Sequence, residues 1–582
     1  MPIRYRTDEE LHNHISNPPA SEPLEHADVI IAGSGPVGMA YARTILETCP
    51  KATVLMLDIG SQDSAVAGEH HKNSIKYQKD IDLFVNVIKG ALQNVSIPPA
   101  DTYIPTLVGD AWTPPVTDDG PGSHTLVFQG SNPNQIREKN LKAAAMTRTV
   151  GGMSTHWTCA CPTPHPEEIE KNPIPKSERD KLYQRAHVLL NVHNDQYDKN
   201  AQGQDISIRH NVVKKTLLDN LPAKRNVQSL PLAVERRKDN PNYVTWTGAN
   251  TVLGDPARFG GRFRLRTETR VTKLVPNKLQ KDSIAGVLLQ DLKNDKDVLA
   301  TAKAYIITCG AIGTPQVLAN SGLQERIPAL GHYLCEQSIA FCQIVMKNEI
   351  IDYIEKNPAW QERIKIHREK HKGDPLPIPF HDPEPQVMIP YTTDFPWHCQ
   401  VHRDAFSYGD VGPRADARVV VDLRFFGRQE IRKENRVYFS GQFSKDRDSW
   451  VAGSTDIYGM PQATFEVTRS QKDNINDQKM MNDMCATADL LGGYLPGSNP
   501  QFMDPGLALH ITGTTRIGTD PKNSVADASS RVHGFKNLWV GGNGCIPDST
   551  GCNPTLTSVM IALKGAAAVK ELLDGHSHGH HK

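Results

Sequence analysis

The sequence predicts an α/β protein, α+β overall, in which a discontinuous Rossmann-like domain carries an inserted domain built on an antiparallel or mixed sheet with helices. A strand, a glycine turn and a helix open the fold at residues 28–48, and a similar unit recurs at residues 304–322. A third strand and turn at residues 536–544 precede a long apolar helix. Short apolar runs are typical of buried parallel strands, and glycine turns into helices are typical of dinucleotide-binding folds. Because these pieces lie at the start, middle and end of the chain, another domain must be inserted between them.

The first glycine turn has the context that dinucleotide binding requires. It follows the apolar run DVIIAG, opens a helix, and is followed by the apolar run ATVLMLD, which ends on Asp58. Glycines allow backbone amides to approach a pyrophosphate closely, and the helix N-terminus favours its negative charge. An acid at the next strand end suits the ribose hydroxyls. The alternative is a glycine turn that only packs the helix on the strand. The expected contacts of the turn are Gly33, Ser34, Gly35, Pro36 and Gly38.

Composition excludes several classes of partner. The 582 residues carry 65 basic and 65 acidic side chains, with no dense basic run, so no nucleic-acid partner is expected. No apolar run approaches the ~18 residues that span a bilayer, so no membrane partner is expected. The N-terminal residues are charged and contain proline, so no conventional secretory signal is expected.

The cysteines and histidines do not predict a metal site. Ten cysteines are scattered along the chain, and only Cys159 and Cys161 form a close pair, without a second pair at zinc spacing. We expect mostly free, buried thiols in a reducing compartment. The histidine-rich residues 576–582 could bind a metal, but they are more typical of a disordered end.

The stretch VGGMSTHWTCA, residues 150–160, places one histidine among glycines and small hydroxyl residues. Its apolar spacing fits neither a helix nor a strand. We interpret it as a loop whose backbone lies close to a flat or bulky group. The alternative is that His156 only packs or forms a hydrogen bond within the loop.

Several motifs together resemble one superfamily. GSGPVG, GAIGTPQVLANSG and the terminal HITGTTRIG resemble the glucose-methanol-choline (GMC) flavoprotein oxidoreductases. VGGMSTHWTCA, QVHRDAFSYG, DLRFFGR and LPGSNPQFMDPGLALH further resemble its fungal pyranose 2-oxidases. These strings run from about residue 28 to 570, nearly the whole chain.

The resemblance implies a flavin-dependent sugar oxidase. FAD is the implied cofactor, and D-glucose and related aldopyranoses such as xylose or galactose are the implied substrates. They would be oxidised at carbon 2 while O2 becomes hydrogen peroxide, with quinones as alternative acceptors. A dehydrogenase with an organic acceptor, or attack at carbon 3 of a glycoside, stays open. A non-catalytic flavin- or sugar-binding protein is disfavoured because His510 and Asn553 are both present.

The resemblance also implies how the flavin is held. His156 corresponds to the histidine that bonds covalently to the 8α-methyl carbon, and Thr158 would lie near flavin N5 and O4. Thr555 would open a helix that points at the flavin ring, where its dipole favours the anionic reduced form. The other implied cofactor contacts are Gly151, Gly152, Met153, Thr155, Cys309, Gly310 and Asn543.

Oxidising an alcohol to a ketone needs a hydride acceptor and a base. A neutral imidazole suits the base because its unperturbed pKa is about 6.5. The resemblance assigns this role to His510, which we expect at a strand end, and pairs it with Asn553. A satisfied core histidine and a helix N-cap before Pro554 are the respective alternatives. Thr515 and Ile517 depart from the commoner family ending, and we expect them to affect the wall of the site.

QVHRDAFSYGDV, residues 400–411, resembles the mobile substrate loop of the family. Polar side chains there suit sugar hydroxyls, and aromatic rings suit the apolar face of a pyranose. Asp410 departs from the small residue usual in the motif. A charged surface loop is the alternative. The expected substrate contacts are Gln400, His402, Asp404, Phe406, Tyr408, Arg424 and Ala508.

We expect a division into two domains and two tails. The tails are residues 1–26 and 576–582. The FAD-binding domain takes 27–160, 206–329 and 501–575, and the substrate-binding domain takes 161–205 and 330–500. Residues 74–99 resemble an oligomerisation arm, which implies a homo-oligomer and, by resemblance, a tetramer. The short segment between 340 and 374 leaves the subunit count open. The expected location is intracellular or at the hyphal periphery.

Overall fold

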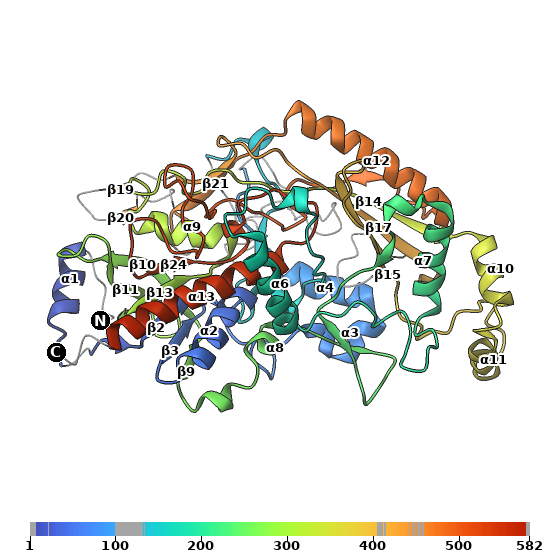
Figure 1. The fold of residues 1–582 in the computed structure, drawn as a ribbon, viewed down its shortest axis with the longest axis horizontal. Coiled ribbons are helices and arrows are strands. Elements are labelled where there is room, and N and C mark those ends of the chain that lie inside the picture. The colour runs from blue at the N-terminus through green and yellow to red at the C-terminus, as the bar shows by residue number, and fades with distance from the viewer. Residues whose placement is uncertain are drawn as a thin grey trace, which may run out of the picture.

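The computed structural model describes residues 7–20, 23–98, 134–403, 415–440 and 459–577, with positions 132, 411, 443–444, 449–450 and 455–456 between them. Figure 1 shows two sheets at opposite sides of the molecule, connected by long loops and flanked by helices. Helices α1 (Asp8–Ser16) and α13 (Thr555–Ser577) lie on the side of the first sheet. The α/β class and the combination of a parallel sheet with an antiparallel one are as predicted.

The first sheet is parallel and has five strands in the order β24-β13-β2-β3-β9. The strands are β24 (Leu538–Val540), β13 (Ala304–Ile307), β2 (Val29–Ala32), β3 (Val54–Leu57) and β9 (Phe263–Arg266). Every residue of β2, β3 and β13 is buried, which explains their unbroken apolar sequence. Helices α2 (Pro36–Thr48) and α13 (Thr555–Ser577) pack against each other beside this sheet (Figure 1).

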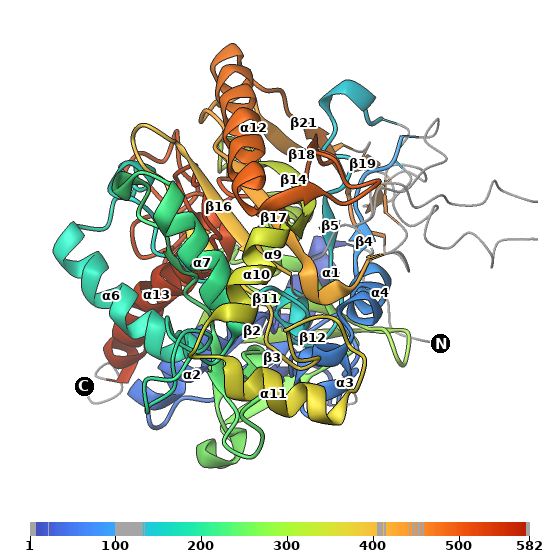
Figure 2. The same ribbon diagram turned by 90° about the vertical axis from the view of Figure 1, so that its right-hand side faces the viewer.

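The second sheet is antiparallel and has seven strands, in the order β22-β14-β17-β16-β15-β6 with β23 pairing β14. The strands are β22 (Gly492–Tyr494), β14 (Ser338–Met346), β17 (Val420–Gly427), β16 (Trp397–His402), β15 (Gln386–Ile389), β6 (Gln228–Ser229) and β23 (Gln501–Phe502). Helix α12 (Gln471–Leu491) runs along it, and Figure 2 shows α12 above the strands with α11 (Gln361–Lys370) at the near end. Apolar side chains of this sheet and its helices form a second core.

The remaining elements complete the two layers and their connections. A four-stranded sheet in the order β1-β12-β11-β10 includes an antiparallel meander of β10, β11 and β12. The strands of this sheet are β1 (Glu25–His26), β10 (Thr269–Pro276), β11 (Ile284–Asp291) and β12 (Lys296–Thr301). The other strands pair two by two: β4 (Gln93–Asn94) with β5 (Ala145–Met146), β7 (Val234–Arg236) with β8 (Val244–Trp246), β18 (Arg436–Ser440) with β21 (Gln462–Glu466), and β19 (Phe443–Ser444) with β20 (Ser449–Trp450). The helices are α1 (Asp8–Ser16), α3 (Ile75–Lys79), α4 (Ile81–Ala91), α6 (Lys176–Leu190), α7 (Ile208–Asn220), α8 (Ala249–Leu253), α9 (Gly310–Asn320) and α10 (Asn348–Lys356).

Two helices pack in the opposite domain from the one expected. Helix α6 lies in segment 161–205, yet Leu182 and Ala186 belong to the core of the parallel sheet. Helix α7 lies in segment 206–329, yet Val213 and Leu217 belong to the core of the seven-stranded sheet. An apolar helix face predicts burial but does not say which sheet buries it, so the sequence assigned both helices by position alone. We therefore propose domain boundaries that exchange these two helices.

Helices α3 and α4 form part of the expected oligomerisation arm. Phe84, Val85 and Ile88 of α4 are buried within this chain, in a small core that includes Phe341 and Phe426. The apolar face of α4 is therefore covered by its own chain, and the homo-oligomer stays a prediction.

All ten cysteines are free, and eight of them are buried, as predicted. Within the described residues no helix is long and apolar enough to cross a membrane. Across the same residues no three His, Cys, Asp or Glu side chains are grouped in a way that could hold a metal ion.

Candidate active site

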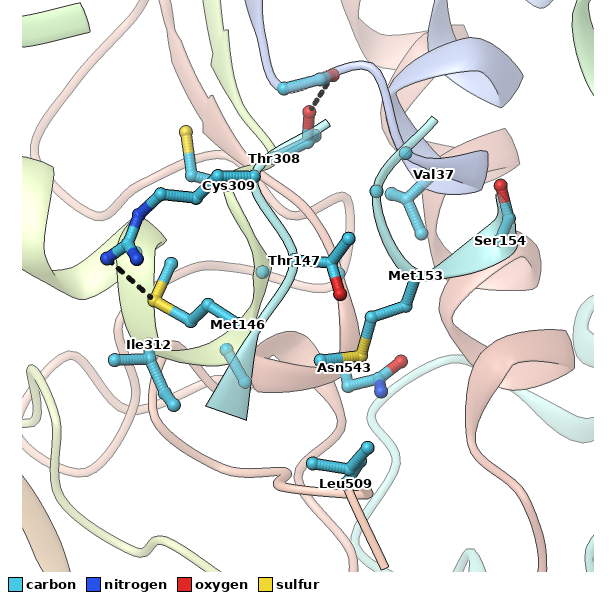
Figure 3. Close-up of a pocket in the computed structure, with 18 of the residues that line it drawn as sticks. Val37, Met146, Thr147, Met153, Ser154, Thr308, Cys309, Ile312, Leu509 and Asn543 are labelled. Carbon is cyan, nitrogen blue, oxygen red and sulfur yellow. Dashed lines mark hydrogen bonds between the residues drawn. The ribbon is translucent and has the colours of Figure 1, made fainter. Parts of the chain in front are cut away.

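A cavity lies between the carboxyl ends of the parallel strands and one face of the seven-stranded sheet. Ala32, Leu57 and Thr308 line it from the first sheet, and Gln400 and Arg424 line it from the second. Figure 3 shows part of its wall, with Val37 of α2 on one side, Cys309 and Ile312 on the other, and Met153 and Asn543 between them. The crevice beyond the carboxyl ends of an open α/β sheet is the usual ligand site of such folds.

The first glycine turn is shaped by its own backbone. Gly33 has a φ of +101°, and a Cβ there would lie 2.4 Å from Thr308 O. A Cβ on Gly38 would lie 2.1 Å from Gly33 O, so this glycine lets α2 pack on the turn. Gly35 differs: it lines the cavity, and the nearest protein atom to a Cβ there is Gly151 O at 4.0 Å. An open cradle at a helix N-terminus fits the pyrophosphate of a dinucleotide.

Asp58 accepts more hydrogen bonds from the protein itself than the sequence suggested. Its Oδ2 accepts hydrogen bonds from Ser34 N at 2.9 Å and Ser34 Oγ at 2.6 Å, and its Oδ1 accepts from Gly60 N at 2.8 Å. Burial raises the pKa of this carboxyl group. A carboxylate has about four acceptor positions. Asp58 therefore fixes the glycine turn and has room for one further donor from the cavity.

Replacing Gly33 should affect the stability of the fold, whereas replacing Gly35 should affect flavin binding. Gly33→Ala should destabilise the fold by about 2–4 kcal/mol, because the new methyl overlaps the backbone of Thr308, directly after β13, at a positive φ. Gly35→Ala should leave the thermal unfolding of the flavin-free protein nearly unchanged and lower the flavin content of the purified protein. Thermal unfolding and the ratio of flavin to protein absorbance measure the two effects. Full flavin content in Gly35→Ala would show that the cofactor does not lie against this turn.

The loop that contains His156 folds onto the glycine turn. Gly151 has a φ of +96° and donates from its N to Ser34 Oγ at 2.9 Å, and a 3₁₀ helix over Gly152–Thr155 follows. His156 is fully buried, and its Nε2 lies 2.9 Å from Thr147 Oγ1. Burial lowers the pKa of His156 to about 3, so the imidazole is neutral. The loop thus presents a neutral imidazole to the cavity wall.

His510 and Asn553 contact each other on the wall of the cavity. Asn553 Nδ2 lies 3.2 Å from His510 Nε2, and Gln400 Nε2 donates to Asn553 Oδ1 at 2.6 Å. On the other side of the ring, His510 Nδ1 lies 2.7 Å from Gln337 Oε1. The Phe426 ring packs 5.6 Å from the His510 ring, centroid to centroid. An imidazole and an amide that face one cavity are suited to bind and deprotonate a hydroxyl.

Two details of this pair differ from the sequence expectation. His510 does not end a strand: it follows a turn over residues 505–508, and Leu509 has a φ of +58°. Asn553 is not the helix cap, because α13 begins at Thr555 and the Asn553 side chain bonds with Gln400 and His510 instead. A short alternating apolar run and an Asn-Pro pair are both ambiguous signals, and tertiary contacts decide them here.

The electrostatics around His510 are set by burial. His510 is partly exposed to the cavity, and the protein around it lowers its pKa to about 3. Glu336 is buried beside it, and burial raises the pKa of this carboxyl group to about 8. Glu336 Oε2 accepts from His510 N at 3.1 Å, which fixes the backbone rather than the ring. The His510 imidazole is therefore neutral at physiological pH.

Most of the predicted site residues line this one cavity. They are Gly33, Ser34, Gly35, Pro36, Asp58, Gly152, Met153, His156, Thr158, Cys309, Gly310, Gln400, Arg424, Ala508, His510, Asn543, Asn553 and Thr555. Arg424 Nη2 also lies 3.7 Å from Asp422 Oδ2.

Other predicted residues lie elsewhere. The cavity wall does not include Gly38, Gly151, Thr155 or His402. Gly38 and Gly151 support the loops, and Thr155 Oγ1 donates to Gly152 O at 2.9 Å. Thr515 and Ile517 are buried, do not line the cavity, and donate from their N atoms to Gly544 O and Cys545 O, so their expected effect on the wall stays a prediction. Asp404, Phe406, Tyr408 and Asp410 lie outside the described residues.

The sequence missed several wall residues and one polar contact. Met146, Thr147, Ile312, Phe426 and Leu509 line the cavity, and Gln337 holds His510 from behind. These are ordinary apolar or polar residues without a motif of their own. Their position near the predicted motifs was the one available signal.

Comparison with known proteins defines the class. Residues 209–339 and 454–562 match two family models, each described as GMC oxidoreductase. The crystal structure of a formate oxidase shares the fold, with a TM-score of 0.60 at 13% identity, over 94% of this chain and 98% of that one. The fold is therefore that of a GMC oxidoreductase, a family of flavoproteins that use FAD.

Full-length relatives narrow the family. The chain is 58% identical to pyranose 2-oxidase of Tricholoma matsutake over 552 residues, which cover 95% of each chain. It is 31% identical to C-glycoside 3-oxidase of Microbacterium trichothecenolyticum, over 94% of this chain and 96% of that one. This chain belongs to the pyranose 2-oxidase family.

Proposed function

We propose that this chain is an FAD-dependent sugar oxidase that converts D-glucose and related aldopyranoses to their 2-keto forms, with O2 as the acceptor and hydrogen peroxide as the product. The observation that supports the proposal is the His510–Asn553 pair, which faces the same cavity as the glycine turn at the N-terminus of α2. A hydroxyl-binding base and a dinucleotide cradle in one cavity are what alcohol oxidation by a flavin requires.

The residues around the cavity fit a flavin dinucleotide. Gly33, Gly35 and the N-terminus of α2 would hold the pyrophosphate. Thr158 and the start of α13 would lie beside the ring, where the positive end of the helix dipole favours negative charge. When bound, the flavin supplies a hydride acceptor at N5. We propose that His156 attaches it covalently, because this imidazole is neutral, buried and beside the cavity.

The protein itself handles the hydroxyl group. Asn553 Nδ2 would donate to the reacting oxygen, and His510 Nε2 would take its proton. Gln400 and Arg424 lie on the wall of the second sheet and would bind neighbouring hydroxyls. The Phe426 ring packs on His510 and would limit how the base moves. Since His510 is neutral, it accepts the proton without first losing one.

One anaerobic experiment tests the function. Adding D-glucose to the protein without oxygen should bleach the flavin absorbance, and admitting air should restore it with about one peroxide per turnover. A flavin band that glucose does not bleach would contradict the sugar substrate. Bleaching that air fails to reverse would indicate a dehydrogenase with a quinone acceptor.

Product analysis tests the position of oxidation. The relatedness to a C-glycoside 3-oxidase makes carbon 3 the alternative to carbon 2. Carbon-13 NMR of the product of [2-¹³C]glucose should show the label as a ketone or its hydrate. An unoxidised label together with full peroxide yield would assign the chemistry to another carbon.

A further inference from the structure

We propose that Gln337 is a positioning residue that fixes the proton of His510 on Nδ1 and so keeps Nε2 available to accept the substrate proton. This inference rests on the proposed function of His510 as the base. Gln337 directly precedes β14, is 6% exposed and does not line the cavity. It touches the side of the His510 ring that faces away from Asn553.

The orientation of the Gln337 amide is dictated by two carbonyl groups. Gln337 Nε2 lies 2.7 Å from Thr550 O and 2.9 Å from Cys552 O. Carbonyl oxygens only accept hydrogen bonds, so the NH2 group must face them. A flipped amide would set its own oxygen against both carbonyls inside the protein. Oε1 therefore faces His510 Nδ1 at 2.7 Å, and Nδ1 must be the donor.

The hydrogen bonds on the other side of the ring agree with this assignment. Gln400 Nε2 donates to Asn553 Oδ1 at 2.6 Å, so the NH2 group of Asn553 faces His510 Nε2 at 3.2 Å. An NH2 group can only donate, which makes Nε2 the acceptor. Each side chain thus donates a hydrogen bond to the next, from Gln400 to Asn553, His510 and Gln337. Gln337 in turn donates to the carbonyl groups of Thr550 and Cys552. A neutral imidazole has one N–H, and both neighbours place it on Nδ1.

The backbone of both partners is held by one carboxyl group. Glu336 Oε1 accepts from Gln337 N at 2.7 Å, and Glu336 Oε2 accepts from His510 N at 3.1 Å. The separation between Gln337 and the imidazole is therefore fixed through the main chain as well as through the side chains. The opposite tautomer would turn lone pair against lone pair at Nδ1 and N–H against N–H at Nε2, and would leave no basic nitrogen facing the cavity.

The tautomer can be observed directly. Nitrogen-15 NMR of the holoenzyme labelled in histidine distinguishes protonated from unprotonated ring nitrogens, and the His510 signals are those lost in His510→Gln. We expect a protonated Nδ1 and an unprotonated Nε2 in the wild type. Gln337→Glu keeps an acceptor beside Nδ1 and, as a protonated carboxyl group, one donor toward Thr550 O and Cys552 O, so it should keep this pattern. Gln337→Leu removes the acceptor and should populate the Nε2–H form. A protonated Nε2 in the neutral wild-type ring would overturn the proposal.

Kinetics separate positioning from packing. Gln337→Leu should slow flavin reduction at saturating sugar by ~10-fold or more, below the ~10²- to 10⁴-fold that a lost general base costs. The KM should change little, because Gln337 does not line the cavity. Gln337→Glu should recover most of the rate. Wild-type rates and signals in Gln337→Leu would also overturn the proposal.

Gln429→Leu is the matched control. Gln429 is another buried amide, whose Oε1 accepts from Glu336 N and whose Nε2 donates to Thr468 O, without contact to His510. Its variant should keep the wild-type tautomer and rate, and a tautomer change there would assign the effect to packing. If Gln337→Leu does not fold, the wild type and Gln337→Glu still decide the tautomer. A wild type with protonated Nδ1 that no sugar reduces would contradict the proposed function alone.

Discussion

Replacing His510 by Ala is expected to slow reduction of the flavin by D-glucose by ~100-fold or more, the loss that follows removal of a general base. We propose His510 as the base because its Nε2 lies beside Asn553 at the cavity, and burial lowers its pKa to about 3, which keeps the ring unprotonated. Anaerobic stopped-flow absorbance of the flavin band measures the rate. The flavin content should not change, because His510 belongs neither to the glycine turn nor to the loop that contains His156.

The pH dependence provides a second test of the same base. A histidine with a lowered pKa stays unprotonated down to the lowered value, so the wild-type reduction rate should show no histidine limb near pH 6.5. The rate should instead be flat between about pH 5 and 7.

His332→Ala is a suitable control for His510→Ala, since that imidazole bonds to Lys433 O away from the cavity. Near-normal reduction in His510→Ala would place the base on another residue.

The parallel sheet could be predicted because its signals are local. β2, the Gly33 turn and α2 are continuous in sequence, and the same holds for β13 with α9. Burial on both faces makes such strands uniformly apolar, so each is visible without knowing its neighbours. The pairing of the edge strand β9 with β3 was not visible in the sequence. The domain membership of α6 and α7 depends on long-range packing, which no local pattern encodes.

The residues of the site also divide into those that a local motif predicts and those that only the fold brings together. His156, His510 and Asn553 stand in motifs and could be predicted, whereas Gln337 and Phe426 come into contact with His510 only through the fold. The role of Gln337 depends on the carbonyls of Thr550 and Cys552, more than two hundred residues further along the chain. A hydrogen-bond direction of this kind depends on three separate segments. The sequence could therefore supply the base and its amide partner, but not what orients them.

Replacing His156 by Ala is expected to change the flavin from acid-stable to fully releasable. A covalent bond to His156 would keep the yellow colour in the acid precipitate of the wild type, whereas a flavin held only by the cavity would pass to the supernatant. The loop favours attachment at His156: the ring is fully buried, its Nε2 lies 2.9 Å from Thr147 Oγ1, and its pKa is lowered to about 3. Bond formation needs an unprotonated ring nitrogen, which this pKa ensures at neutral pH.

The matched control for this variant is His71→Ala. His71 is the other histidine whose charge affects His156, and its Nε2 lies 3.3 Å from Asp63. The control should retain its flavin after precipitation, as we expect of the wild type. Absorbance of pellet and supernatant at the flavin band, with mass spectrometry of the peptide that contains residue 156, measures the outcome. A yellow pellet from His156→Ala would move the attachment to another residue, and a colourless wild-type pellet would show that the cavity alone holds the flavin.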